Sequence, residues 1–113
     1  MTIFEWLDKN GREEVCAELT KMATDITGTP VTCFINEENP EYNEIAFYFE
    51  FDDGSHLSPL LIFEEEDCTE LTTTKILKLV AEVVYDEFCN DRYGDWSGKQ
   101  RRFIDALNFW ADN

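Results

Sequence analysis

Apolar residues recur every three or four positions in three segments of the chain, which is the spacing of one face of an α-helix. The first segment begins with a capping box at residues 2–5 (TIFE) and runs to the stop signal at Gly28. Gly11 either permits close helix packing or divides this segment into two shorter helices. The second segment covers residues 73–89, and the third follows another capping-box sequence at residues 97–100. We therefore predict helices at both ends of the chain.

Between these helical segments the pattern changes to a period of two, which is typical of β-strands with one buried face. The clearest strand covers residues 45–51, after a shorter run at residues 31–35. An Asp-Gly hairpin signal at residues 52–55 leads into a third strand at residues 56–64, and Pro59 predicts that this strand lies at an edge. The apolar positions of the clearest strand share one face: Ile45, Phe47, Phe49 and Phe51.

This order of elements predicts one α+β domain over residues 1–113, α-β-β-β-α-α, with a three-stranded antiparallel meander packed against helices. Hydrophobic residues make up 43% of the 113 residues, which is sufficient for a core. We expect the following residues in that core: Leu7, Leu19, Ile45, Phe47, Phe49, Val80, Val84 and Leu107.

Charge is distributed unevenly along this pattern. Residues 22–74 contain thirteen Asp and Glu and no Lys or Arg, so this block carries −13 of the total charge of −16. A surface so acidic repels phosphate, which argues against direct binding of nucleic acid and favours a basic partner protein. No apolar run approaches the ~20 residues that span a bilayer, and no basic segment with an apolar stretch opens the chain. We expect a cytoplasmic protein that has no contact with membranes.

A three-stranded meander brings the first turn and the end of the third strand to one end of the sheet. The acids there define a predicted acidic pole, for which we expect partner binding: Glu37, Glu38, Glu41, Glu44, Glu64, Glu65, Glu66 and Asp67, with Glu70 nearby. Some of the acids that follow the third strand also suit the start of a helix, where negative charge is favourable. A solvated surface without a partner is the main alternative. A metal site is a weaker one, because the run lacks the alternating oxygen ligands and the glycine of a calcium loop.

Other candidate chemistry is sparse. Four cysteines have no closely spaced pair, so we expect free thiols, with Cys16, Cys33 and Cys89 in apolar surroundings. His56 is the only histidine and accompanies no nucleophile motif. We therefore predict no catalytic residue, no cofactor and no metal.

One basic cluster, at residues 99–102, opens the last helix, where cations oppose the helix dipole. We expect it to dock internally onto acids such as Asp91 and Asp95, with contact to a partner as the alternative. Phe109 and Trp110 are adjacent, so both cannot lie on one narrow helix face. Trp110, together with Tyr48 on the second face of the sheet, is a candidate for apolar contact with a partner or within a homodimer.

In size, charge and lack of catalytic motifs, the chain resembles the small acidic inhibitors that phages and mobile elements direct against restriction, CRISPR or DNA-repair enzymes. Some of these imitate the charge of DNA. The resemblance involves no alignable motif and implies a binding protein, not an enzyme, that occludes the basic surface of a nucleic-acid-binding partner, in the host cytoplasm if phage-encoded. The alternative is an acidic chaperone or adaptor that binds through apolar surfaces. Acidic chaperones of secreted effectors share the helix-then-meander pattern but have additional strands between their last helices, which this sequence does not predict.

Overall fold

Two α-helices precede the strands and three follow them, which confirms the predicted α+β class. The computed structural model describes residues 1–113. None of its helices has the length and continuous hydrophobicity that a bilayer span requires. In chain order the elements are α1 (Ile3–Asn10), α2 (Arg12–Thr27), β1 (Val31–Asn39), the 3-10 turn η1 (Pro40–Tyr42), β2 (Glu44–Phe51), β3 (His56–Leu57), β4 (Leu60–Ile62), α3 (Glu65–Cys68), α4 (Thr73–Asn90) and α5 (Gly98–Asp112).

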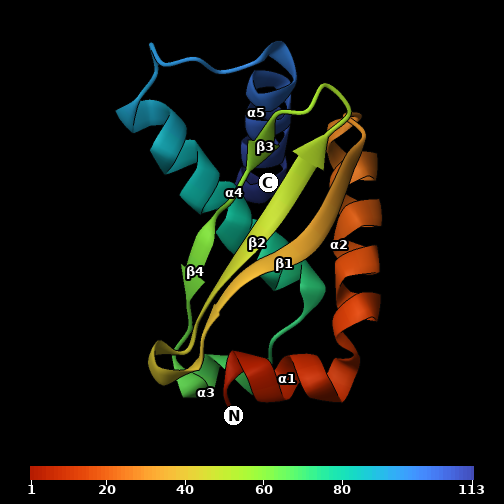
Figure 1. Cartoon of the computed structure of the whole chain (residues 1–113), viewed down its shortest axis with the longest axis vertical. Coiled ribbons are helices and arrows are strands. Elements are labelled where there is room, and N and C mark those ends of the chain that lie inside the picture. The colour runs from red at the N-terminus through yellow and green to blue at the C-terminus, as the bar shows by residue number, and fades with distance from the viewer.

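The first helical segment is divided at Gly11. Its φ of +89° belongs to the left-handed region that side chains other than glycine's rarely adopt. Thr2 and Glu5 form the predicted capping box at the start of α1. Because the chain turns at Gly11, α1 crosses one end of the sheet while α2 runs along its side (Figure 1). The structure therefore shows the second alternative for Gly11, division of the segment into two shorter helices.

The sheet is the predicted antiparallel meander, with β2 at its centre. The third strand is divided into β3 and β4, yet both keep one register along β2, from Phe49↔Leu57 to Ile45↔Leu61. Pro59 interrupts the ladder because it has no N–H to donate, although its carbonyl still accepts from the Phe47 amide at 3.1 Å. The predicted edge position of Pro59 is confirmed.

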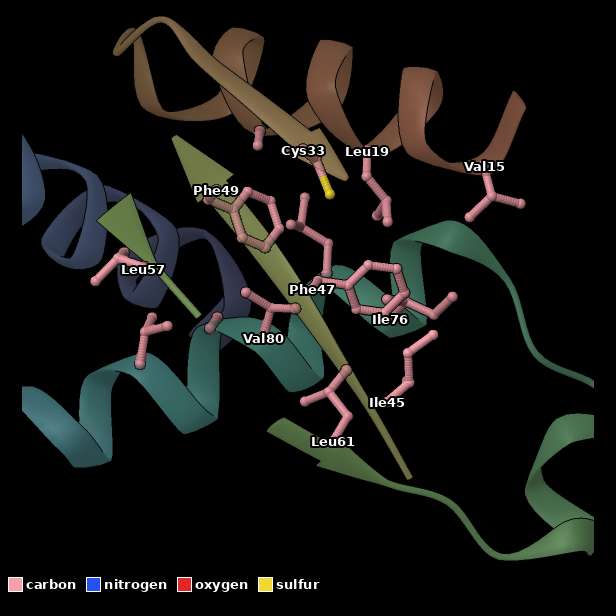
Figure 2. Packing of buried hydrophobic residues seen from close by; sticks show 14 of the residues in the cluster. Val15, Leu19, Cys33, Ile45, Phe47, Phe49, Leu57, Leu61, Ile76 and Val80 are labelled. Carbon is pink, nitrogen blue, oxygen red and sulfur yellow. The ribbon is translucent and has the colours of Figure 1, made fainter. Parts of the chain in front are cut away.

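The core lies between one face of the sheet and helices α2, α4 and α5. All eight residues that we expected in the core are fully buried, and Figure 2 shows Phe47 and Phe49 pointing from β2 into this cluster. In Figure 1 the strands stand in front of α4 and α5, and no helix crosses in front of them. We call this uncovered side the open face of the sheet.

The outer edge of β1 is covered by α2. The Cys33 amide donates to Thr20 Oγ1 at 2.8 Å, and the Val31 amide donates to Thr24 Oγ1 at 3.3 Å. One helical turn earlier, the thiol of Cys16 lies against the Cys33 thiol and the Ile35 amide, and these hydrogen bonds lower the pKa of Cys16. A polar stripe on α2 thus satisfies the backbone groups that β1 directs away from β2.

Candidate functional site

The acidic pole exists as a structural unit at one end of the sheet. Figure 1 shows the β1–β2 connection, the end of β4, α3 and α1 gathered there. The buried Asn43 joins these segments: its Oδ1 accepts from the Ile3 amide at 2.8 Å, and its Nδ2 donates to the Phe63 carbonyl at 2.9 Å. Its φ of +52° is left-handed, which asparagine tolerates better than most residues. Asn43 therefore fixes the backbone that displays the acids.

The predicted acids lie at this pole, although one local expectation was wrong. Strand β1 continues to Asn39, so Glu37 and Glu38 are in the strand, not in the turn. A bulge at Asn36 shifts the register, and pairing with β2 then continues through Glu37↔Ala46, overriding the weak strand propensity of these residues. The second acidic group forms its own short helix, α3, with Glu64 as its N-cap. It does not open α4, which has its own cap at Thr72.

Arg12, from outside the acidic block, partly neutralises the pole. Its guanidinium contacts Glu38 at 2.5 Å and Asp8 at 2.9 Å, and these carboxylates raise the pKa of Arg12. Asn39 Nδ2 donates to Glu44 at 2.9 Å. Two further ion pairs, Lys21–Asp25 and Lys99–Asp52, involve acids of the block that are outside the pole. Ten of the thirteen carboxylates in residues 22–74 therefore form no ion pair.

These carboxylates are spread over a surface and do not converge on one point. No three Asp, Glu, Cys or His side chains anywhere in the chain are arranged so that they could hold a metal ion. Within β2, Glu44 and Glu50 lie on the open face but are separated there by Ala46 and Tyr48. The acids thus do not form an uninterrupted row along one strand.

The open face carries an aromatic stack that crosses all three strands. Tyr48 lies between Phe34 and His56, with ring centroids 4.7 Å apart on each side. Exposed aliphatic side chains of β4, Leu60 and Ile62, extend the apolar area toward the acidic pole. Tyr48 was expected at an interface from the sequence, whereas these two aliphatic residues were not. Three consecutive apolar residues were the signal, because alternate side chains of a strand point to opposite faces, and of Leu60, Leu61 and Ile62 only Leu61 is buried.

The basic cluster docks internally, but with a different acid from those we expected. Lys99 forms an ion pair with Asp52 of the β2–β3 turn, not with Asp91 or Asp95. Arg101 lies over the Phe88 ring, 5.5 Å from its centroid. The pairing follows from the fold, because the hydroxyls of Ser55 and Ser97 are 3.0 Å apart and bring this turn to the start of α5.

The remaining candidates are divided between core and surface. Trp110 packs partly against the core, with Lys78 over its ring, whereas its neighbour Phe109 is 73% exposed. All four cysteines are free thiols, as expected. Cys89 is exposed, which contradicts its expected apolar surroundings, because the preceding residue Phe88 takes the inward position near the end of α4.

Cations and strands occupy separate parts of the molecule. Every Lys and Arg lies in a helix or in the loop before α5, and none lies in β1 to β4. The sheet side is therefore acidic, while the helical side is nearly balanced.

Comparisons with protein-family models, curated proteins and solved structures found no match to this chain.

Proposed function

We propose that this protein binds and occludes a basic surface of a partner protein, using the acidic pole and the adjoining open face. The observation that carries the proposal is the segregation of charge by layer: the uncovered side of the sheet has an apolar centre, unpaired carboxylates around it and no cation. Apolar contact at the centre with charges at the rim is the common anatomy of protein interfaces.

A nucleic-acid-binding protein is the partner class that best fits this surface, because such proteins present Lys- and Arg-rich clefts. Complementary charge would speed the encounter, and the aromatic stack would fix the register of the complex. Since Ala46 and Tyr48 separate the acids of β2, the proposed occlusion relies on a matching surface more than on a copy of the phosphate row of DNA. The proposal includes no catalytic step.

An adaptor or chaperone that binds mainly through apolar contacts is the second candidate. The stack of Phe34, Tyr48 and His56 favours it, since neighbouring exposed rings are typical of interface centres. The two functions share one surface and differ in how strongly charge contributes. Salt dependence of binding separates them.

The test uses a partner captured with the immobilised protein and then purified. The triple variant Glu64→Lys, Glu65→Lys and Glu66→Lys should slow association by about tenfold or more, because steering acts on encounter. Raising the salt concentration should slow the native protein similarly. The matched control reverses three exposed acids of the helical layer, Glu82, Asp86 and Asp105, and should lose much less. Thermal stability of the pole variant should hold or improve as repulsion decreases.

Two results would reject parts of this proposal. Unchanged affinity and salt dependence, with binding lost instead on mutation of Trp110 or Tyr48, would favour the adaptor function. For the absence of catalysis, the test is His56→Phe, which keeps a ring in the aromatic stack but removes the imidazole nitrogens: it should leave the biological activity intact. Loss of activity with fold and partner binding retained would require a catalytic role for His56.

A further inference from the structure

The outer edge of β4 has unused backbone hydrogen-bonding groups. The Phe47 amide donates to Pro59 at 3.1 Å and the Phe63 amide donates to Asn43 at 3.0 Å, so Pro59 and Phe63 direct their backbone toward β2. Alternate residues of an antiparallel strand direct these groups to the opposite side. The N–H and C=O of Leu60 and Ile62 therefore point away from the sheet.

This stretch is the part of the sheet boundary that the helices leave uncovered. Along β1, the stripe on α2 satisfies the outward amides. At the other end of the third strand, Gln100 of α5 donates to the His56 carbonyl at 2.7 Å. Leu60 and Ile62 lie beyond that contact, and their side chains are 41% and 69% exposed on the open face. An uncovered edge beside exposed aliphatic side chains is a template for another strand.

We propose that this edge accepts an extended basic segment of the partner as an added antiparallel strand beside β4. The inference rests on the proposed function and specifies the form in which the partner docks. Main-chain hydrogen bonds would then provide affinity, and alternate side chains would provide specificity.

Charge decides which occupant fits the edge. Glu44 pairs in register with Ile62, and Glu64 to Asp67 follow directly after β4. A second copy of this chain would place the same acids beside one another, and each copy carries a net charge of −16. A basic strand is attracted by the negative field of these acids instead. Its Lys or Arg occupy the alternate positions whose side chains face away from the open face, so they do not contact Glu44 directly. Its intervening residues, which bond to the backbone of Leu60 and Ile62, also share the open face with them and should be apolar.

The probe is a synthetic peptide of alternating lysine and valine, KVKVKVK, and the readout is two-dimensional NMR of the labelled protein. Binding should shift the amide signals of Leu60 and Ile62 and slow their exchange with solvent. Two further peptides are methylated on backbone nitrogens: one on all three valines, the other on three of the lysines. Their charge and number of methyl groups are equal. Methylation of the valines should weaken binding at least tenfold, whereas methylation of the lysines should have little effect.

A protein-side comparison tests the same edge. Ile62→Lys should weaken binding of the unmodified peptide at least tenfold. Tyr42→Lys makes the same charge change at a side chain of similar exposure, 68%, in η1 at the same end of the sheet, and should weaken binding only slightly.

Equal loss with the two methylated peptides, or with the two variants, would overturn strand addition and leave charge-driven binding by the acidic pole in place. Failure of every peptide to bind would also overturn strand addition. The proposed function has its own test in the charge-reversal kinetics with the captured partner, so the two failures are distinguishable.

Discussion

The two edges of the sheet are managed in different ways. The β1 edge is covered by α2. The polar side chains of α2 that face this edge are four residues apart in the helix, and the β1 amides that they meet are two residues apart in the strand. The spacings match, because four helical residues rise about 6.0 Å and two strand residues about 6.6 Å. The β4 edge has no such cover. It is short, it is broken by Pro59 and it lies beside a concentration of negative charge.

The difference shows two solutions to the hazard of an exposed strand edge. A covering helix removes the hydrogen-bonding groups from every partner. A short strand with nearby charge only excludes partners of the same charge, including other copies of the chain. The second solution leaves the edge available to a segment of opposite charge, which is why the β4 side is the more informative edge for function.

Hydrogen exchange should show the largest contrast between the edges. The Cys33 amide is bonded to Thr20, whereas the Leu60 amide points away from the sheet. We expect Leu60 to exchange at least about a hundredfold faster, because it needs no opening of the structure. The Phe47 amide, bonded to Pro59, serves as the protected internal reference. Equal protection of Leu60 and Cys33 would mean that the β4 edge is covered after all.

Removing one acceptor from α2 should destabilise the fold. Thr20→Val leaves the Cys33 amide without a partner in a half-buried position, which should lower the free energy of unfolding by about 1–3 kcal/mol. The measurement is urea denaturation. Thr32→Val makes the same chemical change at an exposed side chain on the open face, and should stay within about 0.5 kcal/mol of the native protein. A similar loss in both variants would show that the covering contact is not the cause.

The order in which the cysteine thiols react should also show that α2 covers the β1 edge, although the expected effect is smaller. Hydrogen bonds from the Cys33 thiol and the Ile35 amide lower the pKa of Cys16, while the hydrogen bond with Cys16 and burial raise the pKa of Cys33. Near pH 8 we expect iodoacetamide to modify the exposed Cys89 and then Cys16, with Cys33 protected in the folded protein. Peptide mapping over time gives the order. Early labelling of Cys33 would indicate that α2 detaches readily from β1.

The smallest expected effect concerns the start of α1. The Thr2 amide and hydroxyl hydrogen-bond with Glu5 and lower the pKa of its carboxyl group. A depressed carboxyl pKa contributes stability that is present above the unfolded value, about 4.3, and is lost as the pH falls through the folded value. Glu5→Gln should therefore reduce the melting temperature slightly at pH 7, and the difference should disappear toward pH 2. A constant difference across this range would exclude the ionised cap as its cause.

Local patterns in the sequence predicted most of the fold and only part of the site. The capping boxes, the alternation in β2 and the edge position of Pro59 depend on neighbouring residues, so they were readable directly. The extension of β1 through Glu38 depends on pairing with β2 across a bulge. The contact of Lys99 with Asp52 depends on where α5 meets the sheet, and no spacing along the chain encodes it. The open edge likewise emerges only from the packing of helices around the strands.

Asn43 has a consequence for the thermodynamics of binding. By joining the start of α1, the β1–β2 connection and the end of β4, it holds the surrounding acids on backbone that is already ordered. A flexible acidic loop would lose conformational entropy when it docks, and this loss subtracts from affinity. In this protein the backbone that carries the acids is already ordered in the folded state, so this conformational entropy is lost during folding and not during binding. Binding at the acidic pole should therefore show little of the ordering penalty that accompanies coupled folding, and the free and bound protein should differ little in backbone at this end of the sheet.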